Sequence, residues 1–294
     1  MTSWNDFVES TALMVAGFTN RQEQVTHITE PLTISALTVT VDNATVVSAG
    51  SIVELGSELL HVSGVVGSTV TFSPFGRGYR GTAASAHDLN SKLTVSPAIP
   101  RGYIEAALNE SIEGTWPLVF GVSETDFVYN AAKTTYPLPS GAVKVLAASR
   151  DTLGPTEEWA PIRRFRMDAN ADDTDFVSGS TISIYDPIVP GRRVKVVYTH
   201  TPIRLTDGDV FTDSGLRDAA QDLVRYGAAY RLMPWLEVGH TPGNYAEPNY
   251  SAGLGRATSP TSTGRFLIQA YQLRLQEEAQ ALQALYPIRS HYTR

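Results

Sequence analysis

Two β-rich stretches, each followed by helical sequence, constrain the fold of this chain more than any other feature. Short runs rich in Val, Ile, Thr and Leu recur in residues 26–98 and again in 116–205, separated by Gly, Pro, Asn and Asp. In the first stretch the runs are TISALTVTV, SIVEL, ELLHVS, STVTF and KLTVS. Their spacing is typical of hairpins, so it predicts antiparallel sheets of the small-barrel or sandwich type.

Apolar residues at helical spacing lie outside these stretches. The sequence predicts a helix from Ser3 to near Gly17 and a second one that Gly114 caps in the left-handed conformation. Two long helices follow near the C-terminus. Pro234 is predicted to end the first, and the second is predicted to begin near Arg265. The fold class is therefore α+β. Its predicted parts are an N-terminal helix (1–25), a small β-domain (26–98), a helix (99–115), a second β-rich region (116–205), and C-terminal helices (206–294) with a long loop (237–265) and a tail.

One predicted strand of the second region carries a dense basic run. EWAPIRRFRM (158–167) is expected to place Arg164 and Arg166 on one face and Arg163 on the other. An exposed strand balanced by nearby acidic residues is the first interpretation of this run. Contact with phosphate is the alternative.

Composition excludes several classes of protein. With 42% hydrophobic residues the chain is expected to be globular, and without cysteine it has neither disulfides nor thiolate metal sites. The sequence contains no run of about 18 apolar residues, so no membrane-spanning helix is predicted. The first ten residues do not resemble a secretory signal, so export is not expected. The formal net charge of −7 disfavours binding to nucleic acid, because phosphate affinity comes largely from basic side chains.

A glycine pattern resembles a nucleotide-binding motif. Gly76, Gly78 and Gly81 satisfy G-x-G-x-x-G directly after a predicted strand. A dinucleotide site needs a crossover helix next, and the following TAASAHDLNSK is short and polar. The glycines are therefore predicted to form a tight turn, and no cofactor is expected.

The remaining polar motifs point away from metals and catalysis. Asp168, Asn170 and Asp172 have the first offsets of a calcium loop, but Gly179 stands where the bidentate Glu would be needed. A turn joining two strands is the better interpretation. The histidines occur singly and no nucleophile motif is present, so no metal ion and no enzyme activity are predicted. The histidines are His27, His61, His87, His200, His240 and His291.

One segment resembles a module of virion proteins from tailed bacteriophages. That pattern is a Glu-Leu pair on a strand, a Val-rich hairpin, Arg-Gly-Tyr-x-Gly-Thr, a later His and a final strand. The matching residues here are Glu58, Leu59, Val70, Arg77, Gly78, Tyr79, Gly81, Thr82, His87 and Leu93 to Val95. The order of helix, β region and C-terminal helices, with GYIEAALNESI and LRDAAQDLVRYGAAYRLM, is similar to that of head-to-tail adaptors of long-tailed phages.

The resemblance implies a structural protein of the virion neck, assembled in the host cytoplasm. Such adaptors form a twelve-subunit ring between the capsid portal and the next connector or tail protein, and DNA passes through it without specific binding. The residues expected to dock on the portal are Tyr286, Arg289, His291, Tyr292 and Arg294. Phe266, Leu273 and Leu285 lie off the main apolar stripe of the last helix and are expected to contact neighbouring copies.

Other functions remain open at this point. The chain could be another phage tail or baseplate subunit, or a carbohydrate-binding β module for host attachment. The four Trp residues are too dispersed along the sequence to suggest a sugar-binding platform.

Overall fold

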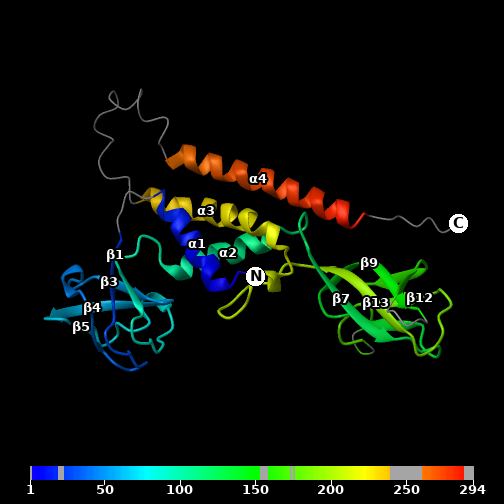
Figure 1. The fold of residues 1–294 in the computed structure, drawn as a ribbon, viewed down its shortest axis with the longest axis horizontal. Coiled ribbons are helices and arrows are strands. Elements are labelled where there is room, and N and C mark those ends of the chain that lie inside the picture. The colour runs from blue at the N-terminus through cyan, green and yellow to red at the C-terminus, as the bar shows by residue number, and fades with distance from the viewer. Residues whose placement is uncertain are drawn as a thin grey trace. The chain divides into compact units, whose positions relative to one another are not determined.

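A computed structural model of the chain describes residues 2–18, 23–152, 158–172, 174, 176–238 and 260–287. In these residues one helix precedes a first group of antiparallel strands, a second helix separates it from a second group, and two further helices follow (Figure 1). The predicted α+β class is therefore confirmed. The chain forms two compact units. The barrel unit comprises Asn5–Leu108 and Arg225–Ile268, and the two-sheet unit comprises Met1–Trp4, Asn109–Val224 and Gln269–Arg294.

The barrel unit is built on one curled sheet. Its strands are β1 (Gln24–His27), β2 (Thr38–Thr40), β3 (Ile52–Leu55), β4 (Glu58–Val66), β5 (Thr69–Phe72) and β6 (Lys92–Val95). They pair antiparallel in the order β1-β6-β3-β4-β5-β2. The edge strands are β1 and β2. Just after each of them, Ile28 and Val41 pair with one another in an isolated antiparallel bridge. The edges therefore meet over a short distance, which protects strand edges that would otherwise be open to pairing.

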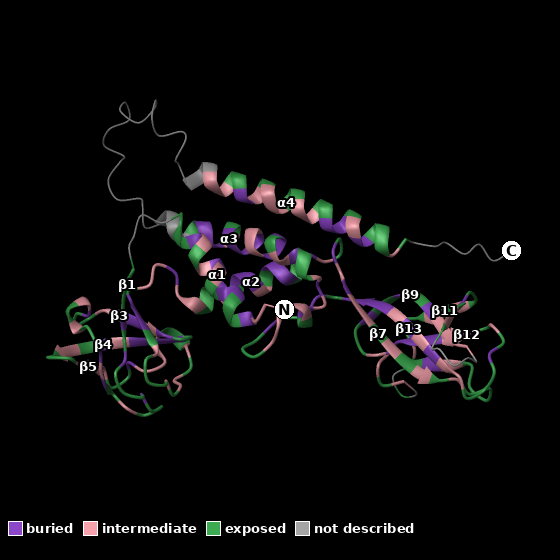
Figure 2. Ribbon diagram, in the orientation of Figure 1, coloured by how far each residue is buried: buried purple, intermediate pink, exposed green. Residues whose placement is uncertain are grey.

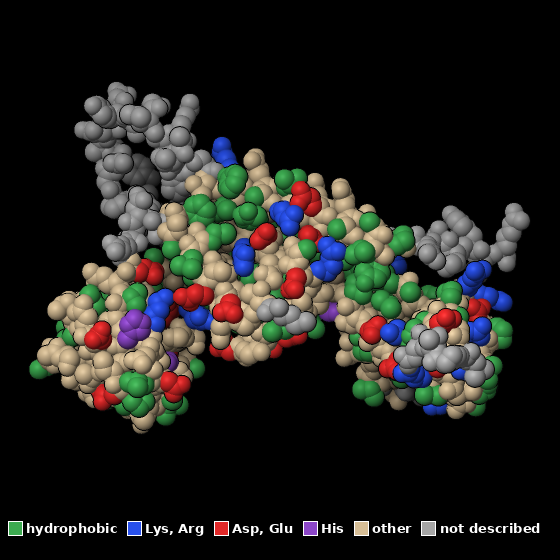
Figure 3. Space-filling model, viewed as in Figure 1, with side chains coloured by type: hydrophobic (Ala, Val, Ile, Leu, Met, Phe, Trp, Pro, Cys, Tyr) green, Lys and Arg blue, Asp and Glu red, His purple; other side chains and the backbone are tan. Residues whose placement is uncertain are grey.

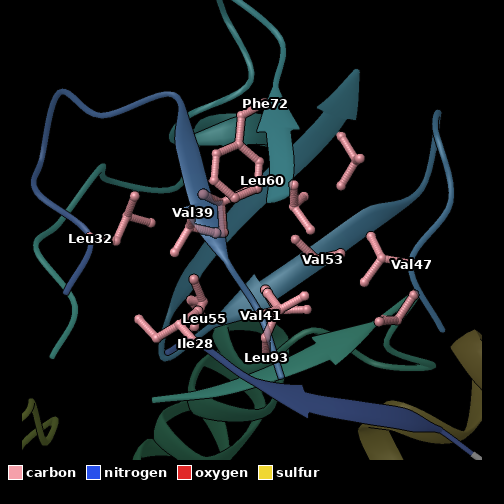
Figure 4. Packing of buried hydrophobic residues seen from close by; sticks show 13 residues of the cluster. Ile28, Leu32, Val39, Val41, Val47, Val53, Leu55, Leu60, Phe72 and Leu93 are labelled. Carbon is pink, nitrogen blue, oxygen red and sulfur yellow. The ribbon is translucent and has the colours of Figure 1, made fainter. Parts of the chain in front are cut away.

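Alternating residues of these strands fill the barrel. Val53, Leu55, Leu60 and Phe72 are almost fully buried and point into one cluster (Figure 4). Period-two alternation therefore identifies the core correctly for the strands that the sequence analysis located. In the run TISALTVTV (33–41), only Thr38–Thr40 forms a strand. The first part of the run is a loop, in which the carbonyl oxygens of Thr33 and Ala36 accept hydrogen bonds from Arg77.

The two-sheet unit contains two antiparallel sheets over a shared core. Its strands are β7 (Gly121–Val128), β8 (Thr135–Pro137), β9 (Ala142–Asp151), β10 (Trp159–Ile162), β11 (Phe165–Asp168), β12 (Thr181–Ile184) and β13 (Arg193–His200). The sheet orders are β10-β9-β13-β7 and β11-β12-β8. Ile182 and Ile184 from one sheet and Val194 and Val196 from the other lie in one buried cluster, as in a sandwich.

The prediction of a single strand at 158–167 is wrong. The run divides between β10 and β11, which belong to different sheets. The chain bends at Arg163 and Arg164, whose backbone N–H groups both donate to the Asp186 carboxylate, at 2.7 and 3.2 Å. The expected assignment of Arg163, Arg164 and Arg166 to two faces of one strand fails for the same reason.

The four α-helices are α1 (Trp4–Ala16), α2 (Arg101–Glu113), α3 (Gln221–Val238) and α4 (Pro260–Leu285). Figure 2 shows buried and exposed residues alternating along them, as amphipathic sequence requires. No helix in the described residues is both long enough and apolar enough to cross a bilayer.

Three details of the helix prediction need correction. Pro234 lies inside α3 and does not end it. Proline has no backbone N–H, so the Tyr230 carbonyl loses its usual donor in the helix. Both residues lie on the exposed side of α3, where this loss is tolerated. α4 begins at Pro260, before the predicted start near Arg265. Gly114 is absent from the glycines with positive φ, so it is not a left-handed cap.

Candidate functional site

A buried carboxylate organises the loops at one end of the barrel unit. Glu58, the first residue of β4, has no exposed side-chain surface. Arg77 binds it through two contacts, Nε to Oε1 at 2.7 Å and Nη2 to Oε2 at 3.0 Å. The backbone N–H groups of Gly78 and Ser85 donate to the same carboxylate at 3.0 and 3.1 Å. His87 Nε2 lies 2.9 Å from Oε2 and must act as the donor, because an ionised carboxylate only accepts.

Arg77 extends this network to two further loops. Its Nη1 donates to the carbonyl oxygens of Thr33 and Ala36, and its Nη2 donates to that of Ser85 at 2.6 Å. A planar guanidinium can make these bonds and the bidentate carboxylate pair together. We call Glu58, Arg77, Gly78, Ser85 and His87 the Glu58 network.

The glycines beside this network serve backbone geometry. A Cβ on Gly76 would lie 2.7 Å from the His61 carbonyl oxygen. Gly78 has φ +60°, and a Cβ there would lie 2.6 Å from the Thr82 carbonyl oxygen. A three-residue 3-10 turn, Tyr79–Gly81, follows in place of a crossover helix. The predicted tight turn is confirmed, and the Gly78 amide is used by a carboxylate of the same chain.

Opposing effects set the ionisation of Glu58. Burial raises its pKa, but hydrogen bonds from His87, Arg77 and the Ser85 and Gly78 amides outweigh this and lower the pKa to about 2. The carboxylate is therefore ionised at neutral pH. Because it is fully enclosed and has five donors, it is suited to fixing loops in place and is not accessible to a substrate.

Helix α4 presents a second candidate site. Within the two-sheet unit, Glu278 pairs with Arg217 at 2.8 Å, and Arg274 donates to the Ala219 carbonyl at 3.2 Å. Leu267, Ala279 and Leu282, which belong to the main apolar stripe of α4, are buried. The predicted contact residues lie outside that stripe: Phe266, Leu273 and Leu285 are 61%, 58% and 57% exposed. We call these three side chains the outer α4 residues.

The portal-docking residues can be located only in part. Tyr286 is half-buried and lines a cavity of about 430 Å³ together with His200 and Arg217. Arg289, His291, Tyr292 and Arg294 lie outside the described residues.

The remaining polar motifs show local roles. Asp168 and Asp172 each accept a hydrogen bond from the backbone N–H two residues ahead, at Asn170 and Thr174, as in Asx turns. Bonds from Thr174 lower the pKa of Asp172. Across the described ranges no group of three His, Asp or Glu side chains could hold a metal ion.

One buried histidine in the two-sheet unit was not predicted to have a structural role. The His200 ring lies against Gly121 and Gly215; its Nδ1 is 2.7 Å from the Thr201 carbonyl and its Nε2 is 3.1 Å from Ser123 Oγ. Nδ1 therefore donates to the Thr201 carbonyl, because a carbonyl oxygen only accepts. Only glycine leaves room on both sides of the ring, but the three segments are too far apart in sequence for local pattern to reveal this.

Replacing Gly121 with Ala is expected to destabilise the two-sheet unit by about 1–3 kcal/mol. The new methyl group would overlap His200, whose ring cannot move without losing both hydrogen bonds. Urea unfolding followed by circular dichroism measures the change. Gly102→Ala is the matched control, because a Cβ there meets nothing within 4 Å. An equal loss of stability in both variants would contradict the packing argument.

Comparison of the chain with models of known protein families gives no match, and neither does comparison with curated proteins.

Proposed function

We propose that this chain is a structural protein of a phage virion, a head-to-tail adaptor that binds the capsid portal, copies of itself and the next connector or tail protein. The Glu58 network carries this proposal. Glu58, Arg77, Gly78 and His87 belong to the pattern that resembles phage virion modules, and they contact one another directly. Thr82, also in the pattern, accepts a hydrogen bond from the Leu59 backbone at 3.0 Å. The pattern is therefore one physical unit, which supports the resemblance.

The outer α4 residues support a role in assembly. Polar contacts hold one side of α4 within the two-sheet unit, whereas Leu273 and Leu285 remain more than half exposed. Their exposed apolar surface would be buried by contact with another protein, and we propose this role for the outer α4 residues. We expect a heterologous contact, in which α4 of one copy meets a different surface of the next and the ring closes by rotation.

The charge distribution is compatible with a conduit for DNA. Acidic and basic side chains are interspersed on the face in Figure 3, and the chain carries a net charge of −7. A ring of such subunits would not hold DNA through phosphate contacts. Passage without specific binding is therefore part of the proposal.

The carbohydrate-binding alternative receives less support. Trp4 is 1% exposed, and the Trp159 ring is covered by Arg193 and Lys195, whose charged groups lie 5.5 and 4.9 Å from its centroid. The Trp4 indole is therefore closed to a sugar, and cationic side chains already lie over the Trp159 ring.

Removing residues 288–294 is expected to abolish binding to the portal protein encoded with this chain, because the tail carries most of the proposed docking residues. A pull-down on immobilised portal measures binding, and negative-stain images show whether the full chain caps the portal ring. Undiminished binding of the truncated chain would contradict tail docking, and absence of capping by the full chain would contradict the adaptor role.

The same complex tests the subunit contact. Leu273→Glu is expected to prevent ring closure on the portal, while Gln272→Glu, also exposed and one position away, is the matched control. Intact rings with Leu273→Glu would show that the outer α4 residues are not the interface.

A further inference from the structure

A cavity of about 360 Å³ lies in the barrel unit between its sheet and the helices α1 and α2. Its volume is within the range of small-ligand sites. On the helix side it is lined by apolar residues, with Val8, Ala12 and Ile104 among them. Leu13, 70% exposed, also lines it. One wall is therefore suited to an aliphatic chain.

The sheet side of the cavity is acidic. Glu54 of β3 accepts one hydrogen bond, from the Arg101 backbone N–H at 2.6 Å. Glu23 accepts one from the Ala98 backbone N–H at 2.9 Å. Within the part of the chain that the structure describes, no Lys or Arg side chain forms an ion pair with either carboxylate.

The basic residues of the cavity are directed elsewhere. Lys92 pairs with Glu9 at 3.1 Å. The Arg101 guanidinium binds Glu105 at 2.8 Å and Asn5 at 2.7 Å. The cavity therefore combines an apolar wall with two carboxylates that form no ion pair with a described side chain.

The pKa of Glu54 is consistent with a carboxylate that forms no ion pair. Burial raises its pKa to about 7; Glu23 and Glu105 add to the rise, while the Arg101 backbone hydrogen bond and charge oppose it. A cation beside Glu54 would replace the solvation that burial removes.

We propose that this cavity binds an arginine side chain of a partner protein, with the methylene stem against α1 and α2 and the guanidinium at Glu54 and Glu23. A guanidinium has donors in a planar fork and is weakly hydrated, so it suits two carboxylates beside an apolar wall better than a compact ammonium does. A hydrated divalent cation would find few oxygen ligands and no use for the apolar wall. This inference goes beyond the adaptor proposal and does not require the partner to be the portal.

The test compares two peptides that differ in one charge. Acetyl-Gly-Arg-Gly-amide and its citrulline counterpart have nearly the same shape, but only the first is cationic. With the 15N-labelled full chain, we expect saturable amide shifts at Val8, Ala12, Arg101 and Ile104 with the arginine peptide, and none with the citrulline peptide. Equal responses to the two peptides, or none to either, would overturn the proposal.

Two variants locate the binding. Glu54→Gln is expected to weaken binding of the arginine peptide about tenfold, the usual effect of losing one charged hydrogen bond. Glu30→Gln removes an exposed carboxylate outside the cavity and is expected to leave binding unchanged. Unaltered binding to Glu54→Gln, or the same amide shifts with calcium chloride alone, would refute the assignment.

Discussion

Replacing Glu58 with Gln is expected to destabilise the barrel unit by about 3–5 kcal/mol, the usual cost of breaking a buried ion pair from one side. Arg77 is only 8% exposed and would be left without its charged partner. The amide NH₂ would also replace one of the two acceptor oxygens, so it would face either the Gly78 or the Ser85 backbone N–H, which the carboxylate now satisfies. Hydrogen exchange of the Leu59, Gly78 and Ser85 amides reports the loss within the barrel unit, and urea unfolding reports its size.

The control for this variant is Glu9→Gln. Glu9 pairs with Lys92, but both side chains are 52% exposed, so its removal is expected to cost at most about 1 kcal/mol. If the two variants lost similar stability, burial of the Glu58 network would not be what strengthens it.

Acid provides an independent check on the same network. The pKa of Glu58 is lowered from 4.5 to about 2 on folding, so the unfolded chain binds its proton first as the pH falls. The stabilisation is therefore complete above about pH 4.5 and is lost progressively towards pH 2. Glu58→Gln should lack this part of the acid dependence.

The elements that sequence pattern located well are those with strong local signals. Strands β3, β4, β5 and β6 have alternating apolar residues and glycine turns, and they lie where the pattern placed them. β1 and β8 were missed because QVTH and TYP are short and contain few apolar residues. Their place in a sheet depends on pairing with distant partners, β6 and β12.

Sequence pattern located Glu58, Arg77, Gly78 and His87 of the Glu58 network, but neither Ser85 nor the contacts among these residues. Arg77 reaches the Thr33 carbonyl across 44 residues of chain, and no local periodicity carries that information. The division of 158–167 has a similar origin, since Asp186, which holds the bend, lies 23 residues from Arg163. Polar contacts between residues far apart in sequence therefore determine both the Glu58 network and the bend between β10 and β11.

Glu54 and Glu58 show how environment alone separates two identical side chains on one hairpin. Glu58 has five donors, including Arg77, and its pKa is about 2. Glu54 has one backbone donor, and its pKa is about 7. The first carboxylate therefore stabilises the fold when ionised, and the second opposes it.

Replacing Glu54 with Gln is accordingly expected to stabilise the barrel unit at pH 8 by up to about 3 kcal/mol, corresponding to a shift from 4.5 to about 7. Because the folded-state pKa is raised, the native protein retains a proton that the unfolded chain has released between these pH values. The stability of the unsubstituted protein should therefore fall as the pH rises from 4.5 to 7, while that of the variant should not show this component. Urea unfolding at intervals between pH 4 and 8 measures the difference. The charged and titratable groups around Glu54 are Glu23, Arg101, Glu105, Glu9, Lys92 and His87.

The sign of this effect links stability to the proposed arginine site. A carboxylate that costs stability when ionised is retained most readily where it serves binding, since Gln would satisfy the Arg101 backbone N–H equally well. Glu54→Gln should thus be more stable at pH 8 and bind the arginine peptide more weakly. Glu30→Gln, which removes an exposed carboxylate, should change neither quantity. A pH-independent difference between Glu54→Gln and the unsubstituted protein would contradict the burial of an ionising Glu54, even if peptide binding were weakened.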